Sequence, residues 1–266
     1  MESIAAEVRY LNEEWRSRSD TPSIGSKETR RANTSKKQVR IHDARDQSLD
    51  LSLDVEGFEL IAHQPSSIDF YNADQVKARY YPEIESVVRR SLKRQCKRVF
   101  FTQHVVRTED TTDFNKAYAR FLHCDYSLNN ARIDGNQIIR AAGLELEEFE
   151  ECDFVWFNSW QPIEWEAELN PLAVIDASSL NSDDIVDYYY NGFGKASLSS
   201  MPVFNPDHRL YYFPRMQTSE VLLIKQLDTR DGVASACPHT SFQNHEASPL
   251  ARPRRSIEVR MMCAVF

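Results

Sequence analysis

Hydrophobic residues recur along this chain mainly with the two-residue period of β-strands. Strand-like runs, either alternating or continuously apolar, cover 39–43, 98–107, 154–160, 171–175, 210–213, 221–226 and 257–266. Helical periodicity is confined to fewer places. A capping box at 72–75 precedes apolar residues in 84–92 that fall on one helix face. Shorter helices are predicted over 137–142 and, after the capping candidate Ser182, over 183–190.

This order of elements predicts a mainly β fold with flanking helices (α+β). Many short strands punctuated by Pro, Asn and Asp, without alternation of strand and helix, favour an antiparallel sandwich or barrel. We expect a double-stranded β-helix, the jelly-roll core of cupin-like enzymes. It would occupy one domain, 37–266, with an N-terminal α/β elaboration. Residues 1–36 are largely polar after a short helical stretch, so we expect a mobile N-terminal segment there.

Composition narrows the class of protein. The 266 residues are 41% hydrophobic, enough for a sizeable core, and a formal net charge of −8 argues against a nucleic-acid partner bound through a broad basic surface. The chain has neither an apolar run near the roughly 20 residues of a membrane span nor a secretory signal. We therefore expect a soluble cytoplasmic protein. Its five Cys are scattered and odd in number, which indicates reduced thiols, and its oligomeric state is left open.

The candidate chemistry is organised around His123 and Asp125, in the strand-like run Phe121–Ser127. Side chains at i and i+2 of an extended strand leave by one face, so both residues would point at the same position. With one distant His they would form the 2-His-1-carboxylate set of non-haem Fe(II) oxygenases. A His-x-Asp pair is a weak signal alone, and the alternative is a surface pair at a strand end.

A second part of the site is predicted near the C-terminus. His239 is followed after fifteen residues by Arg254 and after seventeen by Ser256. In a strand, Arg254 and Ser256 share a face, where a guanidinium and a hydroxyl suit the distal carboxylate of a dicarboxylic acid. Arg260 shares that face and is the competing anchor, unless it pairs with Glu258. The alternatives are a hydrogen-bonded loop role for His239 and a structural ion pair for Arg254.

These residues, His123-x-Asp125, His239 and Arg254-x-Ser256, resemble those of Fe(II)/2-oxoglutarate-dependent dioxygenases. The wider sequence is similar to the fungal hydroxylase/desaturase family that includes gibberellin desaturase and relatives of the cephamycin methoxylase. Matching stretches run in order across 38–266. They are Ile41–Arg45, His104–Arg107, Asn158–Pro162, Pro171–Asp176, Asn205–Pro214, Glu220–Lys225, Pro238–Thr240 and Arg254–Arg260.

The resemblance implies an enzyme in which His123, Asp125 and His239 hold Fe(II), and Arg254 with Ser256 holds 2-oxoglutarate as cosubstrate. Reaction of 2-oxoglutarate with O2 would give succinate, CO2 and an oxidant that removes hydrogen from an unactivated C–H bond of a small molecule. Hydroxylation, desaturation or ring formation would follow, in fungal secondary metabolism. Two alternatives are a zinc-dependent hydrolase on the same fold and a non-catalytic jelly-roll binding module.

The same stretches supply further candidates. Asn158, Trp160, Gln161 and His104 are candidates for the substrate pocket, although core packing or a structural hydrogen bond is the alternative for the His and the Trp. The family usually has a basic residue where this chain has Gln161, which implies a less anionic ligand if that position contacts one. Tyr212 is a candidate for hydrogen bonding to 2-oxoglutarate, with core packing as the alternative.

Overall fold

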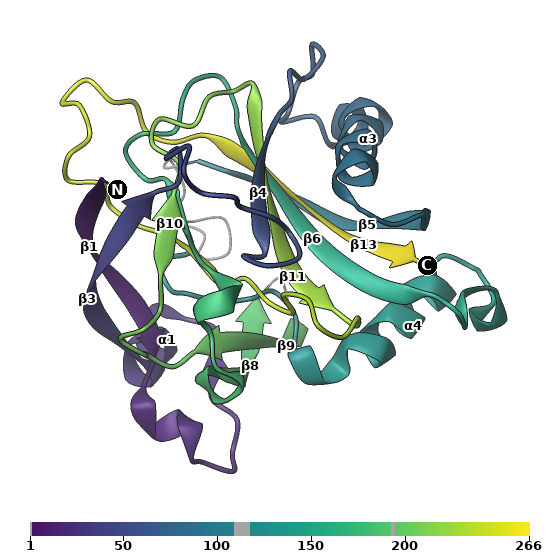
Figure 1. The fold of residues 1–266 in the computed structure, drawn as a ribbon, viewed down its shortest axis with the longest axis horizontal. Helices are drawn as coiled ribbons and strands as arrows, with labels where there is room; N and C mark the ends of the chain where they lie inside the picture. The colour runs from purple at the N-terminus through teal and green to yellow at the C-terminus, as the bar shows by residue number, and fades with distance from the viewer. Residues whose placement is uncertain (1, 109–117, 193–194) are drawn as a thin grey trace.

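The computed structural model describes residues 2–108, 118–192 and 195–266 and shows a mainly β protein (Figure 1). Its strands are β1 (Ser3–Leu11), β2 (Ser23–Ile24), β3 (Thr34–Asp43), β4 (Phe58–Ala62), β5 (Cys96–Arg107), β6 (Asp153–Pro162), β7 (Leu172–Ile175), β8 (Ile185–Gly192), β9 (Lys195–Pro202), β10 (Leu210–Tyr212), β11 (Glu220–Asp228), β12 (His239–Ser241) and β13 (Ser256–Val265). Its helices are α1 (Lys27–Asn33), α2 (Ala73–Gln75), α3 (Tyr81–Ser91) and α4 (Ala131–Ala141). The predicted mainly β fold with flanking helices is confirmed.

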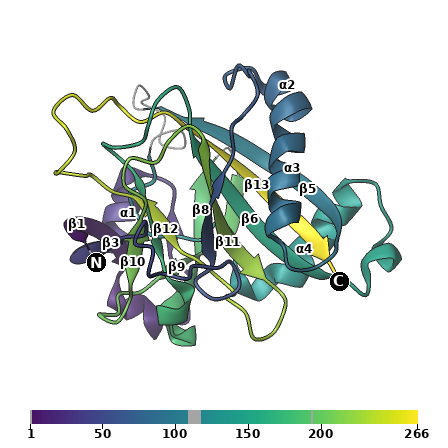
Figure 2. The same ribbon diagram turned by 45° about the horizontal axis from the view of Figure 1, so that its top comes forward.

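The large sheet is antiparallel throughout, in the order β4-β11-β6-β13-β5. One of its faces is covered by a helix in which α2 and α3 are joined by a π-helical turn, Val76–Tyr80, as Figure 2 shows. Ile84, Val87 and Val88 of α3 are buried against apolar side chains of β6, β11 and β13. The helix face predicted from the spacing of apolar residues is therefore the face that packs on the sheet.

The second sheet has the order β1-β3-β10-β7-β12 and faces the other side of the large sheet. The core between them contains Trp160 and Leu222 from the large sheet and Val174 and Tyr211 from the second. The second sheet packs a different apolar cluster against its opposite face, as alternation along a strand requires. The site described below is carried by the extended segment 123–125, by β12 and by residues on the facing side of β6 and β13.

The segment over 1–36 was expected to be mobile, but from residue 2 onward the structure shows strands and a helix in it. The stretch predicted as helical up to Trp15 instead contains β1, which pairs antiparallel with β3 over its whole length. Tyr10 and Leu11 are fully buried, and Trp15 is buried as well. Alternation of apolar and polar residues across Ile4–Tyr10 is a strand signal that the polar composition of the following residues conceals.

The predicted helix over 183–190 is also wrong. Ser182–Asp184 forms a short 3-10 turn, and the chain then enters β8, which pairs with β9 and β2 in a small third sheet. The run Asp187–Tyr190 is rich in Tyr, a residue that favours strands, and this preference outweighs the local capping residue. Among the described residues, no helix has the length and apolar character needed to cross a membrane.

Candidate metal centre

His123 and His239 are joined through their backbones. Each donates its N–H to the other's carbonyl oxygen, at N···O distances of 3.1 and 3.0 Å, in an isolated antiparallel bridge. The next residue, Cys124, exchanges hydrogen bonds with Ser200 on the other side. The segment is therefore extended although it is not a regular strand, and side chains at 123 and 125 leave on one side, as the spacing predicted.

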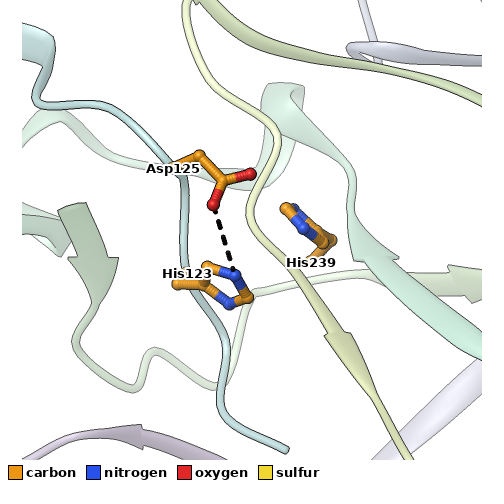
Figure 3. Close-up of side chains that lie close together, drawn as sticks. All are labelled: His123, Asp125 and His239. Carbon is orange, nitrogen blue, oxygen red and sulfur yellow. Dashed lines mark ion pairs between the residues drawn. The ribbon is translucent and has the colours of Figure 1, made fainter. Parts of the chain in front are cut away.

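The three predicted metal ligands converge. Ligand atoms of His123, Asp125 and His239 all lie within 4.8 Å of one another, and Figure 3 shows the side chains grouped around one point. His123 Nδ1 lies 2.9 Å from the carbonyl oxygen of Phe121, while its Nε2 lies 3.8 Å from Asp125 Oδ1. A hydrogen bond from Nδ1–H to that carbonyl would fix the ring and leave the Nε2 lone pair for a metal.

Asp125 is held by neighbouring strands of the large sheet. Its Oδ1 lies 2.7 Å from Arg260 Nη2, and its Oδ2 accepts a hydrogen bond from Asn158 Nδ2. Arg260 also donates from Nε to Glu258 Oε1 at 2.8 Å. Gln226 completes the frame, because its Oε1 accepts from the Asp125 N–H and its Nε2 lies 3.4 Å from His239 Nδ1. The carboxylate is thus oriented from both sides.

Burial and charge set the protonation of the three side chains. Burial lowers the pKa of His123 and, together with the nearby His123 ring, lowers the pKa of His239 to about 4. Burial alone would raise the pKa of Asp125, but the Arg260 guanidinium and the two imidazoles outweigh it and hold that pKa well below its usual range. At neutral pH the set is two neutral imidazoles and one carboxylate, the forms that bind a divalent metal.

Arg254 lies beside this centre. It lines the same narrow cavity as His123 and His239, together with Trp160. Arg254 is 1% exposed, donates from Nη1 to the Asn170 carbonyl oxygen at 2.7 Å and to Ser241 Oγ at 3.2 Å, and stacks over the Tyr118 ring at 4.0 Å. Its Nε has no hydrogen-bond partner in the described part of the chain. Burial lowers the pKa of Arg254 to about 9, which reflects the cost of placing a cation in a dry site.

Ser256 and Asn158 each have a buried polar atom that could bind a ligand. Ser256 Oγ and Asn158 Oδ1 find no hydrogen-bond partner among the described residues. In register, Ser256 lies opposite Pro162 and Arg260 opposite Asn158, so all four belong to the face of the large sheet that looks toward the metal ligands. Buried polar atoms without partners are rare in native structures. Those of Arg254, Ser256 and Asn158 are suited to the polar atoms of a ligand.

Two other predicted pocket residues lie on the far side of the large sheet. Gln161 accepts from Tyr80 Oη at 2.6 Å and donates to the Thr218 and His63 carbonyl oxygens at 2.7 and 3.1 Å. His104 Nδ1 lies 2.8 Å from Tyr81 Oη. Both therefore pack beneath the helix rather than with the metal ligands. The expectation of a pocket role for Gln161 and His104 is not supported by their positions.

Tyr212 is likewise away from the centre. Its ring packs edge-on to Phe242, with 5.5 Å between the ring centroids, in the cluster on the other face of the second sheet. Tyr211, the next residue, faces the core between the sheets with Trp160. Core packing, the alternative to a hydrogen bond with 2-oxoglutarate, is what the structure shows for Tyr212.

Sequence reasoning missed Gln226, whose side chain contacts Asp125 from β11. Asn158 was expected in the substrate pocket, and it contacts Asp125 from β6. The pairing of Arg260 with Glu258, the alternative to a cosubstrate anchor, is what the structure shows. The alternation Ser256-x-Glu258-x-Arg260 in an otherwise apolar strand was a usable signal, because charged groups on a buried strand need partners on the same face. Gln226 gave no comparable signal, since its role depends on a loop distant in sequence.

Comparison with known proteins places this site in a family. A family model described as an oxidoreductase/YMDC permease-like domain matches residues 8–264. Similar curated proteins include the alpha-ketoglutarate-dependent dioxygenase phiK of a fungal species, 27% identical over 87% of this chain and 85% of its own length. The hydroxylase/desaturase efuI of Hormonema carpetanum is 28% identical over 86% of this chain and 83% of its own length. The chain belongs to the fungal hydroxylase/desaturase family.

This hydroxylase/desaturase chain also has the family's fold. The solved structure of the iron and alpha-ketoglutarate-dependent endoperoxidase NvfI superposes with a TM-score of 0.83 at 23% identity, covering 99% of this chain and 98% of that one, and a variant of NvfI gives 0.86 at 22%. The predicted jelly-roll core is confirmed. The enzyme is a dioxygenase of the Fe(II)- and 2-oxoglutarate-dependent class, and neither the zinc hydrolase nor the non-catalytic binding module gains support.

Proposed function

We propose that this dioxygenase oxidises an unactivated C–H bond of a small secondary metabolite at a centre formed by His123, Asp125 and His239. Arg254, with Ser256, would bind the distal carboxylate of 2-oxoglutarate. The observation that carries the proposal is the lining of one cavity by two candidate iron ligands and a buried arginine whose Nε has no partner in the described chain.

The donor set fits Fe(II). Two neutral imidazoles and one carboxylate, grouped within 4.8 Å, are the facial set that leaves positions open for a cosubstrate. Bound iron, with 2-oxoglutarate and O2, supplies the oxidant that removes hydrogen from carbon. The protein itself holds the metal ligands in one geometry and keeps water out of the site. The buried bridge between the two histidine backbones and the clamp on Asp125 serve the first purpose.

The surroundings of Arg254 fit a dicarboxylate. A buried guanidinium needs an anion to offset its desolvation, and its unpartnered Nε and the unpartnered hydroxyl of Ser256 are donors suited to carboxylate oxygens. Trp160 closes the cavity beside it, with its ring 5.4 Å from the guanidinium. Arg260, the competing anchor, supports this assignment indirectly because its guanidinium is already engaged by two protein carboxylates, Asp125 and Glu258.

The test of the iron site uses the visible charge-transfer band that forms when 2-oxoglutarate chelates protein-bound Fe(II) without oxygen. The unmodified protein should form the band, and His123→Ala should lose it together with succinate release on admitting O2. His104→Gln is the matched control, since His104 packs beneath the helix, and it should keep the band. Normal band formation by His123→Ala would contradict the iron assignment.

The test of the cosubstrate site compares two adjacent arginines. Arg254→Met should raise the 2-oxoglutarate concentration for half-saturation of the band at least about 30-fold, because removing one member of a buried charge pair costs about 2–5 kcal/mol. Iron affinity should change little. Arg255→Met removes an equal charge from a more exposed side chain paired with Glu164 and should leave half-saturation near that of the unmodified protein. Equal loss of iron and 2-oxoglutarate binding in Arg254→Met would overturn the assignment.

A further inference from the structure

A second cavity lies on the surface next to Arg254 and is lined by basic side chains. Its volume is about 230 Å³, and its lining includes Arg9 from β1, Arg30 from α1, Lys36 from β3 and Arg120 from the segment before His123. We call the space lined by these four residues the basic cavity. In Figure 1 the elements β1, β3 and α1 lie together at the edge of the molecule opposite α4.

The basic cavity has more positive than negative charge. Glu7 is the one carboxylate in its described lining and forms an ion pair with Lys36. Arg9 donates to the oxygens of Thr34 at 3.4 Å, and Arg120 donates to Asn170 Oδ1 at 3.0 Å. Within the described ranges, no carboxylate forms an ion pair with Arg9 or Arg120. Burial, and then the charges of Arg9, Arg31 and Arg120, lower the pKa of Arg30, so the cations repel one another.

The basic cavity shares a wall with the candidate cosubstrate site. Ser241 lines both cavities, and its Oγ accepts from Arg254 Nη1. Asn170 is the second link, because its backbone oxygen accepts from Arg254 while its side-chain oxygen accepts from Arg120. The outer arginine and the buried one are therefore held by two ends of the same residue.

The charge of the whole chain makes this placement informative. A dianion such as 2-oxoglutarate meets a protein of formal charge −8 and must reach an arginine that is 1% exposed. Cations gathered outside a buried anion site focus the field and raise association rates by about 10 to 10³-fold. The basic cavity lies next to the cavity of Arg254, with Ser241 between them. Its four basic side chains are therefore placed to attract an anion toward Arg254.

We propose that the basic cavity is an outer binding site where 2-oxoglutarate docks before it passes to Arg254. The inference rests on the proposed function and adds the side from which the cosubstrate arrives. Arg9 and Arg120 bind its carboxylates first, and displacement of the Ser241 side chain, which lines both cavities, opens the wall between them. Arg9 and Arg120 then control the rate of association, whereas Arg254 controls the affinity of the final complex.

The experiment follows the anaerobic charge-transfer band by stopped flow, with 2-oxoglutarate as the probe. The double variant Arg9→Gln/Arg120→Gln should lower the association rate constant about tenfold at low ionic strength. The band's amplitude at saturating 2-oxoglutarate should be unchanged. Added NaCl should slow association in the unmodified protein and narrow its difference from the variant. Arg140→Gln, which removes an exposed charge from α4, is the control and should associate like the unmodified protein.

The remaining outcomes separate the outer site from the iron site. An association rate that is unchanged in the double variant, or that is independent of salt in the unmodified protein, overturns the outer site without touching the iron assignment. Failure of the unmodified protein to form any band would instead overturn the proposed function itself. The salt series needs no variant, so it stands even if the double variant folds poorly.

Discussion

At the scale of single residues, the centre is built on a balance of buried charges. Asp125 and Glu258 are both ionised with buried side chains, and Arg260 contacts both. Burial would raise the pKa of Glu258, yet the Arg260 charge keeps that pKa below its usual range. Removing only one partner of such a buried ion pair is costly, because the remaining group stays charged and is shielded from water.

Arg260→Met should destabilise the protein by about 3–5 kcal/mol, the usual cost of leaving a buried charge without its partner. It should also weaken Fe(II) binding by about 10–100-fold, because a residue that orients a ligand has been lost. Chemical denaturation measures the first effect, and titration with Fe(II) under anaerobic conditions measures the second.

A second substitution separates charge from packing. Adding Glu258→Gln to Arg260→Met removes one of the two carboxylates that lose their partner, so the double variant should recover part of the lost stability. Arg260→Lys keeps the charge and should lie between the unmodified protein and Arg260→Met in iron affinity. If Arg260→Met bound iron as tightly as the unmodified protein, its role in positioning Asp125 would be refuted.

At the scale of elements, sequence pattern predicts most of the large sheet and fails where a local signal competes with a distant one. β6, β11 and β13 are predictable because strands buried on both faces have long apolar runs, and the edge strand β5 because its Val and Phe residues favour strands. β8 is mispredicted as a helix because a capping residue precedes it. β12, only three residues long, has no pattern of its own, although its His239 is identified by its distance from Arg254.

The position of the pocket residues shows the same limit. Asn158, Trp160 and Gln161 are neighbours in sequence, but strand alternation sends Gln161 to the helix side and the other two toward the centre. The sequence alone predicts that the residues alternate between two faces, but not which face lies under the helix and which faces the metal ligands. The hydrogen bond from Tyr80 to Gln161 settles it, and that contact joins residues that are 81 positions apart.

Gln161→Leu should therefore affect stability and leave catalysis intact. The substitution leaves the hydroxyl of Tyr80 and two carbonyl oxygens without their partner in a buried place, at about 1–3 kcal/mol for each group left unsatisfied. The free energy of unfolding should fall by at least about 2 kcal/mol, while the 2-oxoglutarate concentration for half-saturation of the band stays within about twofold. Gln38→Leu, on an exposed part of β3, should stay within about 0.5 kcal/mol. A raised 2-oxoglutarate concentration for half-saturation at normal stability would support a pocket role for Gln161 after all.

At the scale of the whole molecule, the metal centre links folding to pH. The two histidines are neutral and buried in the native protein, so the native state resists a proton that the unfolded chain readily accepts. The centre consequently lowers the stability of the protein in acid when no metal is bound. Metal, which needs the same neutral imidazoles, works in the opposite direction.

With iron removed by a chelator, stability should fall as the pH is lowered from about 6.5 to about 4. Over that window His239 binds a proton in the unfolded chain, whose His pKa is 6.5, but not in the native state, where its pKa is about 4. The difference corresponds to about 3 kcal/mol, and above about pH 6.5 the contribution is constant. Urea unfolding at several pH values measures it. His239→Asn should flatten this part of the profile, and an equally steep profile in the variant would contradict the argument.

The bridge between the backbones of His123 and His239 has a consequence for how the enzyme is made. The third ligand comes 114 residues after Asp125 in a chain of 266, so a nascent polypeptide on the ribosome carries only two of the three donors until His239 emerges. Because His239 is positioned by the pairing of β12 with β7, the complete set of three donors forms only after this part of the jelly-roll has folded.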